Sequence, residues 1–92
     1  MNILLDETFE FSLKDIVSYI AKDSKNRAIL FHTTLTNKIH GLSTFPYKYR
    51  KSFHYDDDKV RDLIFKGYTI PYLIDEQKET IIILDIFKWM NK

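Results

Sequence analysis

The sequence has 92 residues and forms one domain, 1–92; two domains are excluded, because separate cores arise only in much longer chains. With 45% hydrophobic and 15% aromatic residues it has enough apolar side chains for a core, which excludes a wholly disordered chain. The 14 Lys and Arg residues nearly balance the 13 Asp and Glu, and the net charge of +1 excludes a whole-molecule field that would attract nucleic acid or an anionic membrane.

The chain carries no signature of secretion, membrane insertion or cofactor binding. It contains no cysteine, which excludes a disulfide framework, a zinc ribbon and a thiol nucleophile. The first residues lack the cationic segment of a signal peptide, and no stretch approaches the roughly 18 apolar residues of a membrane span. Two glycines, Gly41 and Gly67, are too few for a phosphate-binding loop. We therefore expect a cytoplasmic protein without a membrane partner, and we expect no cofactor.

The first elements in chain order are a short strand and a helix. Residues 3–5 are apolar and predict an initial strand, with 3–9 as the longer alternative. Ser12 and Asp15 have the spacing of a capping box, so a helix is expected from about Ser12 to near Asp23. Its apolar positions form one stripe at helical period: Leu13, Ile16, Val17, Ile20 and Ala21.

A second helix is expected directly after Ser24, which is a favourable N-cap residue. Gly41 and Pro46 supply its stop, and so short a link makes the two helices an antiparallel hairpin. Ile29 and Leu30 lie off the main stripe, where they contact either a partner or the chain's own core. The stripe itself repeats at spacings of three and four residues: Ala28, Phe31, Leu35, Ile39 and Leu42.

Strand patterns follow Pro46. Residues 63–65 predict a strand, Lys66-Gly67 a tight turn, and the alternation over 68–74 a second strand. Pro71 within it requires a position where its missing N–H is not needed. After a polar connection at 75–79, the apolar run 80–87 predicts a strand buried on both faces. The fold class is α+β, in the order β-α-α-β-β-β, with a helical hairpin packed on a small, mainly antiparallel sheet.

The most distinctive local cluster is the segment 47–55, which interleaves cations and rings without an acid. Such interleaving suits a nucleic-acid backbone and unstacked bases; an amphipathic loop and strand, with its rings in the core, is the alternative. Lys66, Lys88 and Trp89 join the same patch if the strands bring their ends together. The segment contains Tyr47, Lys48, Tyr49, Arg50, Lys51, Phe53, His54 and Tyr55.

The acidic triplet 56–58 follows this segment directly. Three carboxylates could attract a hard cation such as Mg²⁺. We favour a polar loop in which one Asp caps a short helical turn, because Lys59 and Arg61 follow so closely. No metal site is predicted.

Several short motifs, in this order, resemble the RelE/ParE superfamily of type II toxin–antitoxin toxins. They are Phe45-Pro46, Tyr49-Arg50-Lys51, the segment 60–64, Lys66-Gly67-Tyr68 leading into 69–72, and the segment 82–87. The resemblance covers essentially the whole chain. It implies a small cytoplasmic inhibitor of bacterial growth that a cognate antitoxin neutralises. Some members of the superfamily cleave mRNA in the ribosome, whereas those resembling ParE poison DNA gyrase.

The ribonuclease members need converging basic and polar groups to activate the 2′-hydroxyl and stabilise the phosphate transition state. Where they commonly carry an Arg after the Gly-Tyr pair, this chain has Thr69, and their two lysines correspond to Val60 and Asp62. Because most of that set is missing, we favour a ParE-like toxin without nuclease activity. If the chain is instead a ribosome-dependent mRNA endonuclease with a divergent site, its candidate catalytic residues are Arg50, Lys51, His54, Arg61 and Lys88.

The predicted partners are therefore an antitoxin and DNA gyrase, with the ribosome and mRNA as the alternative. Ile29 and Leu30 are the candidate antitoxin contacts. A degenerate toxin that only binds its antitoxin is the third possibility. The candidate target-binding residues combine cations with a C-terminal tryptophan: Arg50, Lys51, Arg61, Lys66, Lys88 and Trp89.

Overall fold

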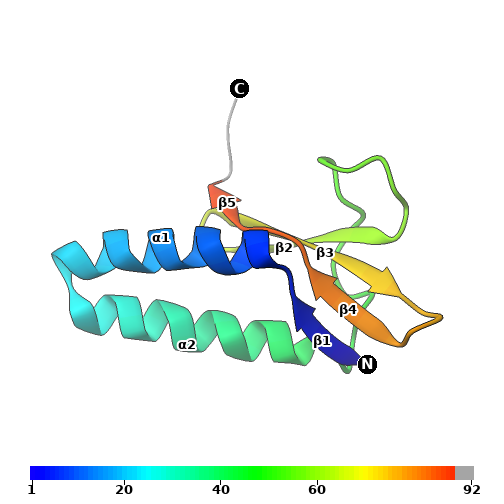
Figure 1. Cartoon of the computed structure of the whole chain (residues 1–92), viewed down its shortest axis with the longest axis horizontal. Coiled ribbons are helices and arrows are strands. Elements are labelled where there is room, and N and C mark those ends of the chain that lie inside the picture. The colour runs from blue at the N-terminus through cyan, green and yellow to red at the C-terminus, as the bar shows by residue number, and fades with distance from the viewer. Residues whose placement is uncertain (89–92) are drawn as a thin grey trace.

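The computed structural model describes residues 1–88, and the predicted contact at Trp89 lies outside this part of the chain. Figure 1 shows two helices running side by side next to a small sheet. In chain order the elements are β1 (Asn2–Leu5), α1 (Glu7–Asp23), α2 (Lys25–Gly41), β2 (Val60–Phe65), β3 (Tyr68–Asp75), β4 (Thr80–Ile83) and β5 (Phe87–Lys88). This order confirms the α+β prediction and adds a short last strand. Within residues 1–88, no helix is long and apolar enough to cross a membrane.

The sheet is mixed, with the strand order β1-β4-β3-β2. The first strand lies at one edge and pairs with β4 in parallel, with Ile3 opposite Ile81. All other pairings are antiparallel, and β5 adds to β3 where Thr69 faces Phe87. The expected initial strand is thus confirmed in its shorter form, and it is the parallel exception in a mainly antiparallel sheet.

The first helix begins earlier than predicted. It starts at Glu7, and Asp6 is its N-cap, because the Asp6 carboxylate accepts a hydrogen bond of 3.0 Å from the Thr8 N–H. The expected start at Ser12 was wrong: Ser12 lies inside the helix, and Phe9, assigned to the longer strand alternative, is a buried helical residue. Phe9 lies four residues before Leu13 and so extends the apolar stripe by one turn.

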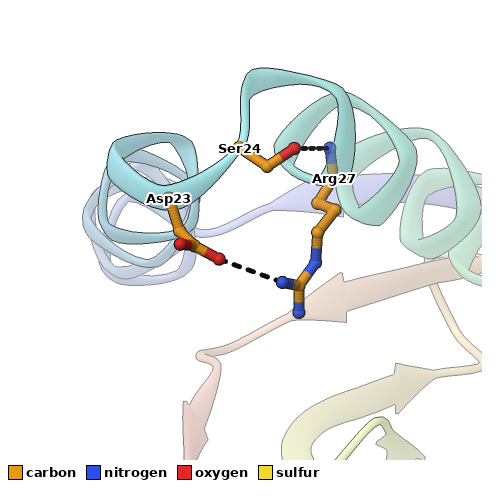
Figure 2. Close-up of polar contacts among 3 residues, drawn as sticks. All are labelled: Asp23, Ser24 and Arg27. Carbon is orange, nitrogen blue, oxygen red and sulfur yellow. Dashed lines mark hydrogen bonds and ion pairs between the residues drawn. The ribbon is translucent and has the colours of Figure 1, made fainter.

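The second helix begins as predicted. The Ser24 hydroxyl accepts a hydrogen bond of 3.2 Å from the Arg27 N–H, and an ion pair of 3.0 Å joins Arg27 to Asp23 across the helix junction (Figure 2). Gly41 is its last residue, but it is not a left-handed cap; instead Leu42 N–H donates to the Ile39 carbonyl in a tightened last turn. All five residues of the predicted stripe are buried, from Ala28 to Leu42.

The hairpin between β2 and β3 is a two-residue turn. Lys66 and Gly67 both have positive φ, 50° and 83°, and they join Phe65 to its partner Tyr68. Two such residues give a type I′ turn, whose twist matches the strands that flank it. The predicted Lys66-Gly67 turn is confirmed.

The apolar run 80–87 is not one continuous strand. The ladder of β4 with β3 ends at the pair Ile83–Tyr72, and β5 resumes at Phe87–Thr69, so this side carries one residue more than β3, as in a β-bulge. The interruption lies opposite Pro71, which has no N–H to donate and whose carbonyl accepts from Leu84 N–H at 2.9 Å. On the other side of Pro71, its partner Asp62 directs its N–H to the Arg50 carbonyl and not to the proline. Pro71 therefore occupies a position where no N–H is needed, as predicted.

The sheet has two distinct faces. The helix face packs against Phe31, Leu35 and Ile39 of α2, and the inward-facing residues of β2, β3 and β4 complete the core. Successive residues of a strand point to opposite sides, so Asp62, Thr69 and Ile82 belong to the other side, which we call the loop face. Ile82 is only partly buried there, so the predicted burial of this run on both faces was wrong.

Candidate functional site

The segment 47–55, which we call the basic loop, lies in the long connection between α2 and β2 (Figure 1). Its rings are largely in solvent: Phe53 is 76% exposed and Tyr47 is 49% exposed, while Tyr49 is half-buried. The amphipathic alternative, with the rings in the core, therefore holds for Tyr49, which packs against the core, but not for Tyr47 and Phe53. The basic loop presents aromatic and cationic groups together on the surface.

The exposed cations of the basic loop stack on these rings. The Arg50 guanidinium lies 4.2 Å from the centre of the Phe53 ring, and Lys48 lies 5.7 Å from that of Tyr49. Lys51 forms an ion pair of 3.5 Å with Asp58, in which both side chains are largely exposed. Because exposed ion pairs contribute little stability, Lys51 remains available to a partner surface.

Arg61 is placed differently from Arg50 and Lys51. It is half-buried on β2, where its guanidinium donates a hydrogen bond of 2.8 Å to the Tyr49 carbonyl and lies 5.0 Å from the centre of the Tyr47 ring. Its Nε is buried and has no hydrogen-bond partner within residues 1–88. This arginine is therefore bound to the basic loop from within the protein.

Lys66 and Lys88 form a second, separate basic group at the β2–β3 turn. Lys88 pairs with Tyr68 and lies 5.5 Å from the centre of its ring, and Lys66 follows Phe65 directly. Phe65 lies four positions after Arg61 on β2, which corresponds to about 13 Å along a strand. The predicted set of six target-binding residues thus divides into two groups, apart from Trp89.

The five residues considered for a nuclease do not converge. His54 packs edge-on against Phe87 at 5.0 Å between ring centres, on the loop face. Arg61 and Lys88 pair with Tyr72 and Tyr68, whose side chains lie on the helix face. The sheet itself therefore separates the imidazole from these two cations.

Carboxylates surround the remaining tyrosine of the basic loop. Burial raises the pKa of Tyr55, and the negative charges of Asp85, Asp62 and Asp6 raise it further. Tyr47, at the other end of the loop, donates a hydrogen bond to Glu76, which raises its pKa as well. These acids make the surroundings of the basic loop much less positive than its own sequence indicates.

The acidic triplet forms a turn and not a helical one. Asp57 accepts a hydrogen bond of 2.9 Å from the Lys59 N–H, and its carbonyl accepts from Val60 N–H at 3.0 Å. An Asp does cap a turn here, as expected, but the prediction that this turn is helical was wrong. Within residues 1–88, no group of three His, Asp or Glu side chains is arranged to hold a metal ion.

An apolar groove of about 340 Å³ lies on the helical side of the molecule. Leu5 of β1, Leu13 and Val17 of α1 and His32 of α2 line it. Ile29, one helical turn before His32, is 64% exposed, and Leu30 is 59% exposed. Neither residue is used by the protein's own core, so the alternative of ordinary burial is wrong for both.

The sequence interpretation missed two residues that organise this region. Asp62 is 1% exposed, yet its position inside a strand gave no sign of a polar role. Tyr72 is fully buried and donates a hydrogen bond of 2.7 Å to the Pro46 carbonyl, at the start of the basic loop. Only the alternation of β2 and β3 could have indicated that Asp62 and Tyr72 point to opposite faces.

Comparisons with known proteins agree with this architecture. A chain from a solved structure described as "Chromosomal ParDE TA system from P. aeruginosa" is similar over 98% of this chain and 97% of its own, with a TM-score of 0.78 and 15% identity. At that identity the similarity establishes the fold alone. The comparison with curated proteins gives no match. Residues 3–89 match the family "ParE toxin of type II toxin-antitoxin system, parDE", and the chain therefore belongs to the ParE toxin family.

Proposed function

We propose that this toxin inhibits bacterial growth by binding DNA gyrase through the basic loop, and that a cognate antitoxin neutralises it. The observation that carries the proposal is the joint exposure of Arg50, Lys51 and Phe53 on a loop that is bonded to the sheet. Arginine and aromatic side chains are the types that most often dominate protein interfaces. Lys66 and Lys88 form the separate basic group at the β2–β3 turn, and the proposed contact does not include them.

The distribution of charge argues against the endonuclease alternative. RNA cleavage requires general acid–base groups and cations around a single phosphate. Here His54 and the two cations on the helix face lie on opposite sides of the sheet, and Asp62 and Asp85 contribute negative charge near Tyr55. A protein surface can accommodate such a mixture of charges, whereas a polyanion is repelled by the acids.

The test compares the wild type with an Arg50→Ala/Lys51→Ala variant in a gyrase supercoiling assay and in growth inhibition. We expect the double variant to require at least about a tenfold higher toxin concentration, since two interface side chains together contribute more than about 1.4 kcal/mol. A Lys25→Ala/Lys38→Ala variant removes two exposed cations from α2 and serves as the control with unchanged inhibition.

Messenger RNA ends are mapped after induction of the wild-type toxin in the same cells. Codon-phased cuts would contradict the gyrase proposal and support the endonuclease. Unaltered inhibition by the double variant, at equal toxin level, would instead show that the target contact lies elsewhere. Harmless expression of the wild type would favour a toxin that only binds its antitoxin.

The antitoxin contact is proposed on the helical side, at the apolar groove and at Ile29 and Leu30. Membership of a toxin–antitoxin family supplies the reason to expect a protein partner here. Three aliphatic side chains, Leu5, Leu13 and Val17, line the groove beside polar ones, and such a mixture suits an amphipathic segment. Lys14 and Glu10, which also line the groove, can pair with charges of either sign on that segment.

We expect an Ile29→Lys/Leu30→Lys variant to bind the antitoxin at least about tenfold more weakly, because each exposed apolar side chain contributes roughly 1 kcal/mol when buried. The free energy of unfolding should change by less than about 0.5 kcal/mol, as for other surface substitutions. Calorimetric titration with the antitoxin measures the first quantity. Ile64→Lys, on an exposed position of the loop face, is the control that keeps the wild-type affinity.

A further inference from the structure

We propose that Arg61 and Asp62 are positioning residues of this toxin: as neighbours on β2 they hold the basic loop from opposite faces of the sheet, in the conformation that presents Arg50 and Lys51. The inference rests on the proposed function, because it assigns a role toward the same target surface. It also changes the predicted role of Arg61, which acts through the loop and does not itself contact the target.

Arg61 provides the hold on the helix face. Its guanidinium donates to the Tyr49 carbonyl at 2.8 Å, and Tyr49 immediately precedes Arg50. The same guanidinium lies 5.0 Å from the centre of the Tyr47 ring, so it contacts the loop at two points. With its charged group engaged in this way and its side chain half-buried, Arg61 offers little to a partner.

The side chain of Asp62 contacts the basic loop on the loop face, and its backbone N–H pairs with the loop at the edge of β2, where Lys51 lies opposite Arg61. Its N–H donates to the Arg50 carbonyl at 3.1 Å, and its Oδ2 accepts from the Phe53 N–H at 3.3 Å. These two bonds from one residue attach the basic loop at Arg50 and at Phe53, on either side of Lys51 and Ser52. The Ser52 N–H donates to the Val60 carbonyl at 2.9 Å and closes the segment onto the strand.

The burial of the Asp62 carboxylate destabilises the fold, and its hydrogen bond to the basic loop explains why an acid stands at this position. The residue is 1% exposed, and within residues 1–88 its Oδ1 has no hydrogen-bond partner. A buried carboxylate with an unsatisfied oxygen destabilises a fold, and an apolar side chain of similar shape in its place is often neutral or stabilising. A residue that lowers stability where leucine would fit indicates a role outside stability. Among residues 1–88, the side chain of Asp62 forms one hydrogen bond, the one to the Phe53 N–H.

Asp62→Leu tests the inference, because it removes the acceptor without creating a cavity. We expect an unchanged or higher thermal midpoint and unchanged antitoxin affinity, at least tenfold faster hydrogen exchange at the Phe53 amide, and at least tenfold weaker inhibition. Asp62→Asn keeps an oxygen that can accept from Phe53 and should stay close to the wild type in all four measurements. A purely structural role would instead lower the thermal midpoint of Asp62→Leu and weaken antitoxin binding together with inhibition.

Arg61→Met is the second variant, and it tests the positioning role if Asp62→Leu does not fold. It keeps the aliphatic length but cannot donate to Tyr49, so inhibition should fall in the wild-type background. Added to Arg50→Ala/Lys51→Ala it should have no further effect, because a positioning residue acts only through the residues that it presents. An additional loss in that background would overturn the inference by showing that Arg61 contacts the target directly.

The outcomes separate this inference from the proposed function. Full inhibition by Asp62→Leu, or an unchanged exchange rate at Phe53, overturns the positioning role even if Arg50 and Lys51 prove essential. Unchanged inhibition by Arg50→Ala/Lys51→Ala overturns the proposed contact, and the positioning role with it. If gyrase is not the target, growth inhibition at equal toxin level replaces supercoiling as the readout, and the same comparisons apply.

Discussion

Single side chains decide where the two helices begin. Asp6 and Ser24 each accept a hydrogen bond from a backbone N–H of the first turn that has no partner within its helix. Ser12 has the same capping chemistry, yet it lies in the middle of α1. The reason is that Phe9 is buried in the core and extends the apolar stripe toward the N-terminus. Capping residues thus mark possible starts, and core packing selects among them.

The junction between the helices permits a matched prediction. Ser24→Ala should lower the free energy of unfolding by about 1 kcal/mol, the usual contribution of an N-cap. Asp23→Ala should cost less than about 0.5 kcal/mol, because its ion pair with Arg27 is exposed and an acid at the end of a helix is unfavourable (Figure 2). Urea unfolding of both variants measures the difference. Equal losses would contradict the role of the cap.

At the scale of elements, the β2–β3 hairpin is the part of the sheet that the local sequence specifies most fully. Both turn residues have positive φ, and a glycine at the second position allows it without steric cost. The local sequence does not specify in the same way how the chain continues after β4. The apolar run 80–87 gave no sign of the break opposite Pro71, because the break depends on the neighbouring strand.

Gly67→Ala should lower the free energy of unfolding by about 1–2 kcal/mol, the range expected for the left-handed conformation of a residue with a Cβ. An added Cβ would meet no atom within 4 Å, so the loss is conformational and not steric contact. Gly41 also has open space around it but a helical backbone, and Gly41→Ala should therefore be neutral or stabilising. Chemical denaturation distinguishes the two; a loss at Gly41 comparable to that at Gly67 would contradict this explanation.

At the scale of the whole molecule, Tyr72 joins the core to the start of the basic loop. Burial raises the pKa of Tyr72 to about 12, because the ionised phenol would lose its contact with water. In the unfolded chain the phenol ionises near its ordinary value of about 10. Between these values the unfolded chain has released a proton that the folded chain retains, so stability falls as the pH rises.

The stabilisation that comes from the raised pKa of Tyr72 is present in full below pH about 10. It falls between pH about 10 and about 12, by at most about 1.4 kcal/mol of unfolding free energy per pH unit. Tyr72→Phe should unfold with a shallower dependence on pH in this window, and at neutral pH it should be about 1 kcal/mol less stable because the bond to Pro46 is lost. A residual slope is expected from Tyr55, whose pKa is raised by burial, and from Tyr47. Identical slopes for both proteins in denaturant titrations would contradict the assignment.

The sequence by itself determined the α+β fold class, the order of the elements up to β4, and the second helix with its complete buried stripe. It also determined the two-residue turn between β2 and β3. These follow from periodicity, capping and glycine chemistry, which act within a few residues of the chain. The basic loop was also identifiable as a cluster, because its composition is local.

The tertiary structure decided which side chains of that cluster face a partner. Arg50 and Arg61 have the same chemistry in sequence, but strand pairing places Arg61 against the Tyr49 carbonyl and leaves Arg50 in solvent. Strand pairing likewise placed His54 and Lys88 on opposite faces, separated Lys66 from Lys51, and gave Asp62 its hold on Phe53. Such relations join residues that are distant along the chain, so no local pattern could specify them.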